Sequence, residues 1–277
     1  MHLDTLAFLD ILFERCVSLR SCARLTFTVI HPTSQQPTPS RHIPLDNRVT
    51  LLDTLQRLSD TNQMGWGAYF AVGLRKPGLS RWKRGGVAEV VALPAFYTDI
   101  DDPTDAALIQ LRDARLPPSV IVHSGGGYHA YWLLDEPTAD LNTARQVLQG
   151  LARTFGGDGL SPAQSLRLPG TVNHNPERGG ALCHLVETSN HHYHLSDFQS
   201  LIPPVPRLQE RQPAPRAAPP PNNKTLNGQL IHAITTVLYR NYAAREQRRS
   251  DWLASLCPCG HARDSPGAVM DGMARCG

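Results

Sequence analysis

The chain has 277 residues, of which 41% are hydrophobic, and its 27 Lys and Arg against 24 Asp and Glu give a formal net charge of +3. This length allows one large domain or two smaller ones, and the composition is ordinary for a globular protein. No apolar run is long enough to span a membrane, and the first residues lack the pattern of a secretory signal. We therefore expect a cytoplasmic protein with no membrane partner.

The first elements in chain order are predicted from the spacing of apolar residues and from β-rich composition. They are a helix over residues 6–16, a strand over 25–30, a helix over 46–61 and a strand over 66–72. Because a reduced compartment makes a disulfide framework unlikely, the scattered Cys16, Cys22 and Cys183 are predicted to be small buried side chains.

An apolar run that begins at Val87 is predicted to be a buried strand, and it ends in Asp99 and Asp101. Residues i and i+2 of a strand point to the same face, so the two carboxylates project side by side. Neighbouring carboxylates repel each other unless a cation or proton lies between them, and hard oxygen ligands suit Mg²⁺ or Mn²⁺. An Asp-rich turn that continues into Asp102 and Pro103 is the alternative interpretation.

A glycine-rich turn follows between two predicted strands, residues 119–123 and 128–134, after a predicted helix over 104–115. The turn consists of Ser124, Gly125, Gly126 and Gly127. Consecutive glycines permit φ > 0 and leave backbone N–H groups open to a ligand, which suits phosphate. His129 lies just after the turn, where its ring can donate to a phosphate oxygen. An ordinary glycine hairpin with a half-buried histidine fits the same pattern.

Asp158 and Arg167 are the next candidates, after a helix predicted over residues 138–155. Asp158 stands among glycines and can be either a third acidic ligand or a turn former. Arg167 lies between two leucines, so on an extended segment it points away from them. A guanidinium that faces a cleft suits bidentate contact with phosphate, although a surface arginine before a Pro-Gly turn fits equally well.

Eight prolines in residues 203–226 predict a semi-extended linker between a core, residues 1–202, and a C-terminal segment, residues 227–277. Residues 226–256 are predicted to be largely helical. Residues 203–277 carry ten Lys and Arg against five Asp and Glu. This balance suits either an anionic partner such as nucleic acid or a solvated tail.

In this order the motifs resemble those of the archaeo-eukaryotic primase superfamily, in particular its plasmid- and phage-borne primase and primase-polymerase branch. The resemblance covers roughly residues 6–202. The acidic pair of the family matches Asp99 and Asp101, and its Ser-x-His-type motif matches Ser124 and His129. Its third acidic residue matches Asp158, and its Arg-Leu-Pro-Gly-Thr-x-Asn signature matches Arg167 to Asn173. Family members often place a Lys after that Asn. Here His174 and Asn175 follow, and Arg178 can replace the lysine.

The resemblance implies an α/β (α+β) primase core with an RRM-like sheet and a nucleotidyltransferase activity. The enzyme would synthesise primers on single-stranded DNA in the replication of a plasmid, phage or other mobile element, and a replicative helicase is a further implied partner. Two metal ions, Mg²⁺ or Mn²⁺, would be held by Asp99, Asp101 and Asp158. The nucleoside triphosphate would be bound by Ser124, Gly125, Gly126, Gly127, His129, Arg167 and Asn173.

The C-terminal cysteine cluster resembles the start of a primase-type zinc finger. Cys257, Cys259, His261 and Cys276 can supply four Zn²⁺ ligands. The downstream cysteine pair is incomplete, because Met273 stands where its first member belongs if Cys276 is the second. A zinc site and a degenerate or truncated finger therefore both stay open.

Two other functions fit part of the pattern. A replication-initiator DNA-binding module without polymerase activity would keep the fold, but the intact Asp99 and Asp101 argue against it. A metal-dependent nuclease also uses clustered carboxylates, yet it has no need of a triphosphate-binding glycine turn or of Arg167.

Overall fold

The computed structural model describes residues 3–33 and 38–202, together with Thr236 and four short strands between residues 245 and 276. The chain divides into two units, Met1–Val205 and Pro206–Gly277, which are described separately below. The predicted linker over residues 203–226 lies outside the described residues.

Nine strands of the first unit form one sheet in the order β8-β3-β1-β4-β5-β7-β6-β9, with β2 paired to β1. All of these pairings are antiparallel. The strands are β1 (Arg24–Ile30), β2 (Ser40–Pro44), β3 (Gly67–Ala71), β4 (Leu74–Arg75), β5 (Val90–Ile100), β6 (Val120–His123), β7 (Tyr128–Thr138), β8 (Ser165–Arg167) and β9 (His184–Thr188).

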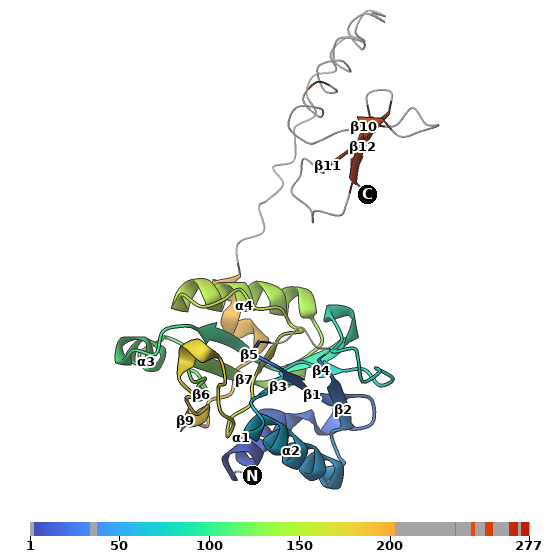
Figure 1. Ribbon diagram of the computed structural model, residues 1–277. Coiled ribbons are helices and arrows are strands. Elements are labelled where there is room, and N and C mark those ends of the chain that lie inside the picture. Colours follow the sequence, from blue (N-terminus) through green and yellow to red (C-terminus); the bar gives the residue numbers. More distant parts are fainter. Residues whose placement is uncertain are drawn as a thin grey trace, which may run out of the picture. The chain divides into compact units, whose positions relative to one another are not determined.

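Helices cover both faces of this sheet, with α4 on one side and α1 and α2 on the other (Figure 1). The α-helices are α1 (Leu3–Phe13), α2 (Arg48–Gln63), α3 (Asp105–Arg112) and α4 (Leu141–Phe155). Short 3₁₀ helices connect them: η1 (Glu14–Leu19), η2 (Val87–Glu89), η3 (Pro176–Arg178) and η4 (Leu195–Leu201). The two longest helices begin at side-chain caps, since Asn47 accepts from the Thr50 amide and Asp140 from the Thr143 amide.

The central strands β5 and β7 are buried on both faces, which explains their continuous apolar runs. Neighbouring residues on β7 face opposite layers. The Trp132 ring lies 5.5 Å from that of Phe155 on α4, whereas the Tyr131 ring lies 5.3 Å from that of Phe8 on α1. His129, two residues before Tyr131, therefore shares the α1 face of the sheet.

The described part of the second unit is a four-stranded antiparallel sheet in the order β10-β11-β12-β13. Its strands are β10 (Arg245–Glu246), β11 (Leu253–Leu256), β12 (Pro266–Met270) and β13 (Met273–Cys276). The prediction of helix over residues 226–256 is wrong at β10 and β11, because backbone pairing with neighbouring strands overrides the local helical pattern.

The predicted zinc ligands Cys257, Cys259 and His261 lie outside the described residues. Cys276 is the last residue of β13, and only its backbone is described. In the part of the chain that the structure describes, no helix is long and apolar enough to cross a membrane.

Candidate active site

Three aspartates converge at the end of β5. Asp99 is the next-to-last residue of that strand, and Asp101 follows it. Helix α4 ends at Gly156 in the left-handed conformation, and two residues later the Asp158 amide donates to the Asp99 carbonyl at 2.8 Å. A Cβ at Gly157 would lie 2.5 Å from the same carbonyl oxygen, so this close approach requires glycine. The turn after α4 thus brings Asp158 beside the acidic pair.

The charges of these carboxylates act on one another. The pKa of Asp99 is raised to about 7, first by burial and then by repulsion from Asp101 and Asp158, while Arg167 and Arg178 oppose the rise. Only 28% of the Asp99 side chain is exposed, against 69% for Asp101. The excess of negative charge fits a divalent cation.

Among the described residues, however, no group of three His, Cys, Asp or Glu side chains is placed to hold one metal ion. An ion at this site would therefore be held by one or two of these carboxylates, with water or phosphate oxygens as its other ligands.

His129 lies directly opposite Asp99 in the β5–β7 register, and its Nε2 is 3.4 Å from Asp99 Oδ1. The histidine is buried, and this burial, with the nearby Arg167 and His123, lowers its pKa to about 3. The ring is therefore neutral. Its Nδ1 lies 3.5 Å from the hydroxyl of Tyr131, whose pKa burial raises well above its usual value. That hydroxyl stays protonated and can donate to Nδ1, which leaves the ring proton on Nε2, facing Asp99.

The glycine turn is closed rather than open. The Ser124 amide donates to the Gly127 carbonyl at 2.8 Å, and all three glycines are buried. A Cβ at Gly127 would overlap the carbonyl oxygen of Ile100, and one at Gly126 would lie 2.7 Å from Arg178 Nε. Neighbouring groups thus cover the turn in this structure, and the role of Ser124 and the three glycines in nucleotide binding stays a prediction.

Arg178 links the glycine turn to the acidic pair. Its Nη1 donates to the Gly126 carbonyl at 3.1 Å, and its Nη2 donates to Asp101 Oδ1 at 3.0 Å. From the sequence, Arg178 is predicted only to replace a lysine of the family. No local sequence pattern predicts its contact with Asp101. Arg178 therefore adds a partly exposed positive charge to the site.

Arg167 approaches the site from β8. Its Nη2 donates to the Tyr69 hydroxyl at 2.9 Å, and its guanidinium carbon lies 4.9 Å from the centre of that ring. The flanking Leu166 and Leu168 are buried, as the alternation predicts. Arg167 Nη1 is buried and has no hydrogen-bond partner in the described part of the chain. A buried, unpartnered guanidinium N–H is well suited to an anionic ligand.

Asn173 is buried and has a supporting position. Its amide nitrogen donates to the Ser124 carbonyl at 3.4 Å, and its side-chain oxygen accepts from the Asn175 backbone at 3.1 Å. Two further buried polar atoms without a partner among the described residues flank the motifs, namely Thr98 Oγ1 and His174 Nε2.

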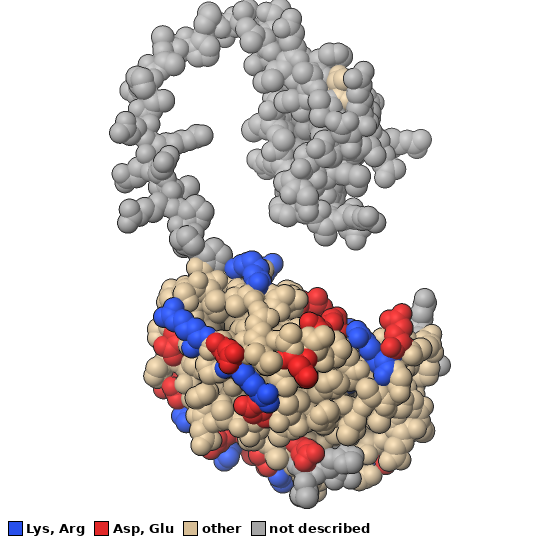
Figure 2. Space-filling view, turned by 90° about the vertical axis from the view of Figure 1, so that its left-hand side faces the viewer, with Lys and Arg blue, Asp and Glu red and all other residues tan. Residues whose placement is uncertain are grey.

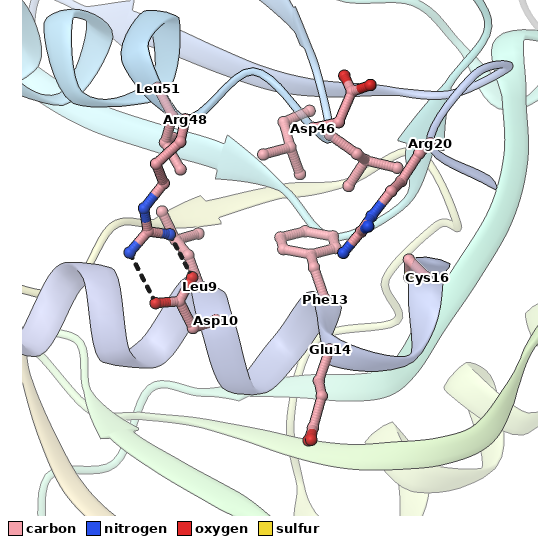
Figure 3. Close-up of a pocket in the computed structure, with 11 residues that line it drawn as sticks. Leu9, Asp10, Phe13, Glu14, Cys16, Arg20, Asp46, Arg48 and Leu51 are labelled. Atoms are coloured by element: carbon pink, nitrogen blue, oxygen red, sulfur yellow. Dashed lines mark hydrogen bonds and ion pairs between the residues drawn. The ribbon is translucent and has the colours of Figure 1, made fainter. Parts of the chain in front are cut away.

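A separate hollow of about 320 Å³ lies between α1 and α2 and contains none of the motif residues (Figure 3). Arg48 donates to Asp10 across it at 2.9 Å, and Arg20 and Phe13 point toward each other on its other side. Since both charges of the exposed Arg48–Asp10 pair are already matched, the aspartate cluster is the better candidate.

Comparison with known proteins identifies the family of the chain and agrees with its fold. The model of the RepB DNA-primase N-terminal domain family matches residues 56–197, just over half of the chain. The chain belongs to this primase family, and its resemblance to the archaeo-eukaryotic primase superfamily is confirmed. No curated protein matches the chain.

A solved structure with a TM-score above 0.5 shares the fold. The archaeo-eukaryotic primase (AEP) domain of the cyanophage S-2L primase-polymerase has a TM-score of 0.53 and 21% identity, over 73% of this chain and 98% of that one. The catalytic domain of primase RepB′ in complex with initiator DNA has a TM-score of 0.49 and 17% identity, over 72% of this chain and 91% of that one. The likeness to the S-2L domain, together with the family match, confirms the predicted α/β primase core.

Proposed function

We propose that this protein is a DNA primase or primase-polymerase that joins nucleotides on a single-stranded DNA template in the replication of a mobile element. The observation that carries the proposal is the cluster of Asp99, Asp101 and Asp158 beside two arginines, Arg167 and Arg178, in a chain of a primase family. Negative groups for cations and positive groups for a triphosphate meet there.

Each Mg²⁺ or Mn²⁺ ion is proposed to be held by one or two of the three aspartates. The raised pKa of Asp99 supports this, because repulsion from Asp101 and Asp158 adds to the effect of burial. Bound cations supply the positive charge that stabilises an attacking 3′-oxygen and a leaving pyrophosphate. His129 is a positioning residue in this proposal: its neutral ring keeps Asp99 oriented and adds no competing positive charge.

The triphosphate is proposed to bind the two arginines. Arg167 has a buried N–H that has no partner among the described residues, and Arg178 is partly exposed at the end of η3. The glycine turn acts with them, since the Gly126 carbonyl positions Arg178, and Asn173 holds the turn through the Ser124 carbonyl.

Residues 1–202 are proposed to be the catalytic core, joined through the linker over 203–226 to a template-binding segment over 227–277. The division of the chain into units at residue 205 supports this arrangement. Zn²⁺ bound by Cys257, Cys259, His261 and Cys276, and a replicative helicase as partner, remain proposals that rest on the sequence.

A primer-synthesis assay tests the function. Full-length protein with single-stranded DNA, labelled nucleotides and Mg²⁺ or Mn²⁺ should give extended products, whereas Asp99→Asn and Asp101→Asn should each give none while remaining folded. Template cleavage without synthesis would instead identify a nuclease. Near wild-type synthesis by either variant would contradict the metal-binding role of the pair.

A further inference from the structure

We propose that the loop between β4 and β5, residues 76–86, is a platform for single-stranded DNA. Trp82 would stack on an unpaired base, while Arg81, Lys83 and Arg84 contact phosphates. This inference deepens the proposed function and rests on it for the identification of the bound strand as template. The loop lies next to β4 (Figure 1).

The loop combines positive charge with an exposed aromatic ring. Residues 75–84 contain five Lys and Arg, no Asp or Glu, and two of the three lysines of the chain. Trp82 is 61% exposed, although a large ring normally packs against the protein. Elsewhere, on the face shown in Figure 2, basic and acidic residues are interspersed. The charge of the loop is thus a local feature.

Backbone contacts fix the loop and leave its side chains outside. The Arg81 carbonyl accepts from the Ser40 amide at 2.7 Å, and the Lys83 carbonyl accepts from His42 Nε2 at 2.9 Å. The Arg84 carbonyl accepts from Nε of the buried Arg75 at 3.2 Å. Because these three anchors use main-chain oxygens, the side chains remain available to a ligand, and a pre-ordered loop loses little conformational entropy on binding.

The three basic side chains, Arg81, Lys83 and Arg84, are exposed and form no ion pair within the described part of the chain. Lys76 differs, since it lies 3.5 Å from Glu89. The guanidinium of Arg81 lies 5.1 Å from the Trp82 ring centre, on one face. This leaves the other face for a base, and the positive charge close to it for a phosphate.

A hollow lies between the loop and a tyrosine that contacts the candidate active site. The hollow, of about 400 Å³, is lined by Arg84 and Gly85 from the loop and by Tyr69 and Ser165 from the sheet. Tyr69 in turn contacts Arg167 of the candidate active site. In this proposal, a strand that stacks on Trp82 continues past Arg84 into this hollow and toward the site. Single-stranded rather than duplex DNA is expected, because base pairing and stacking hide base faces from an aromatic side chain.

The test measures the affinity of the full-length chain for a fluorescent oligothymidylate by anisotropy, in EDTA and without nucleotides. Trp82→Ala should weaken binding about 5- to 100-fold, the range expected for loss of one base–aromatic stack, and Trp82→Phe should retain most of the affinity. Lys83→Gln combined with Arg84→Gln should also lower the slope of log affinity against log salt by about 1.4.

The matched control is Arg115→Gln combined with Arg145→Gln. It removes the same charge from exposed positions away from the loop and should change the slope much less. Photocrosslinking to bromodeoxyuridine DNA should also label Trp82. The inference is overturned if Trp82→Ala binds within twofold of the wild type, or if the loop and control variants have equal slopes.

The experiments distinguish a failure of the proposed DNA platform from a failure of the proposed function. If the wild type makes primers but Trp82→Ala leaves binding unchanged, the platform is wrong and the proposed function stands. If binding depends on Trp82 but no primers form under any metal or nucleotide condition, the proposed function is wrong and the platform stands.

Discussion

The ionised Asp99 side chain lowers the stability of the folded chain by an amount that depends on pH. Its pKa is about 7 when folded and about 3.8 when unfolded. Between these values the folded state binds the proton and the unfolded state does not, so this residue's contribution to stability falls as pH rises from about 4 to 7. A bound divalent cation would offset the cost.

Asp99→Asn should therefore stabilise the metal-free protein at pH 8 by on the order of 4 kcal/mol, because each unit of difference in pKa corresponds to about 1.4 kcal/mol. The gain should disappear near pH 4. Urea unfolding at the two pH values measures it, with Asp113→Asn at the exposed C-cap of α3 as the control. An equal effect of Asp99→Asn at both pH values would contradict the assignment of the charge repulsion to this residue.

Arg178 offers a second test at the scale of one residue. Its removal leaves Asp101 without its 3.0 Å partner and uncovers Gly126. Arg178→Ala should raise the nucleotide KM about 10- to 100-fold, as expected for loss of one or more charge-assisted hydrogen bonds. Arg178→Lys should recover part of this loss, and the neighbouring Glu177→Gln should behave as the wild type. Steady-state kinetics at saturating template measures the nucleotide KM of each variant. An unchanged KM in Arg178→Ala would show that this arginine does not bind the triphosphate.

At the scale of elements, the close approach of β7 to the end of β5 requires that Gly127 has no side chain. A methyl group at Gly127 would overlap the carbonyl of Ile100, the residue between Asp99 and Asp101. Gly127→Ala should destabilise the protein by roughly 1–3 kcal/mol and displace both aspartates, so that more Mn²⁺ is needed for activity. At Gly159 an added Cβ has no atom within 4 Å, so Gly159→Ala is the matched control. Denaturation measures the stability of both variants, and Mn²⁺ titration measures the concentration that each needs for activity. Equal stability and equal Mn²⁺ requirement in the two variants would contradict the prediction.

The same elements show how far the sequence could predict the fold. Apolar periodicity located β1, β3, β5, β7, α2 and α4 to within a few residues, because each has a pattern of its own. Four short strands of the first unit, β2, β4, β8 and β9, were not predicted. They have two to five residues, and their strand structure depends on partners that are distant in sequence.

In the candidate site, too, some features follow from a local sequence pattern and others depend on residues that are distant in sequence. Alternation along one strand was enough to place Asp99 and Asp101 together. The contact of Arg167 with Tyr69 joins residues 98 positions apart, and no local pattern encodes it. Cys16 and Cys183 are buried as predicted, but Cys22 is exposed, so that prediction is wrong for Cys22, which lies in the turn after η1.

For the whole molecule, we expect the two units to be separable. A chain ending at residue 205 should fold and extend an existing primer with Mg²⁺ or Mn²⁺, because the candidate site lies wholly in the first unit. Starting a new primer should be weaker, since initiation must hold the template and two nucleotides without a duplex. Circular dichroism and the two kinds of primer assay compare the truncated and full-length chains.

Elemental analysis completes this test. The full-length chain should contain about one zinc ion and the truncated chain none, by the four-ligand arrangement of structural zinc sites. If the full-length chain has no zinc and truncation leaves initiation unchanged, the C-terminal cysteine cluster is a remnant.

The buried Arg75 has a consequence for the order in which the first unit assembles. Its guanidinium donates to the carbonyls of Gly73, Arg84 and Ala163, and the last of these lies 88 residues away in sequence. Such a distant junction is slow to form, and it leaves a buried charge without its acceptors whenever one segment detaches. Residues 76–86 and 161–165 should therefore open together, with one common rate of amide hydrogen exchange, and a nascent chain should not order the loop over residues 76–86 before residue 163 has been synthesised.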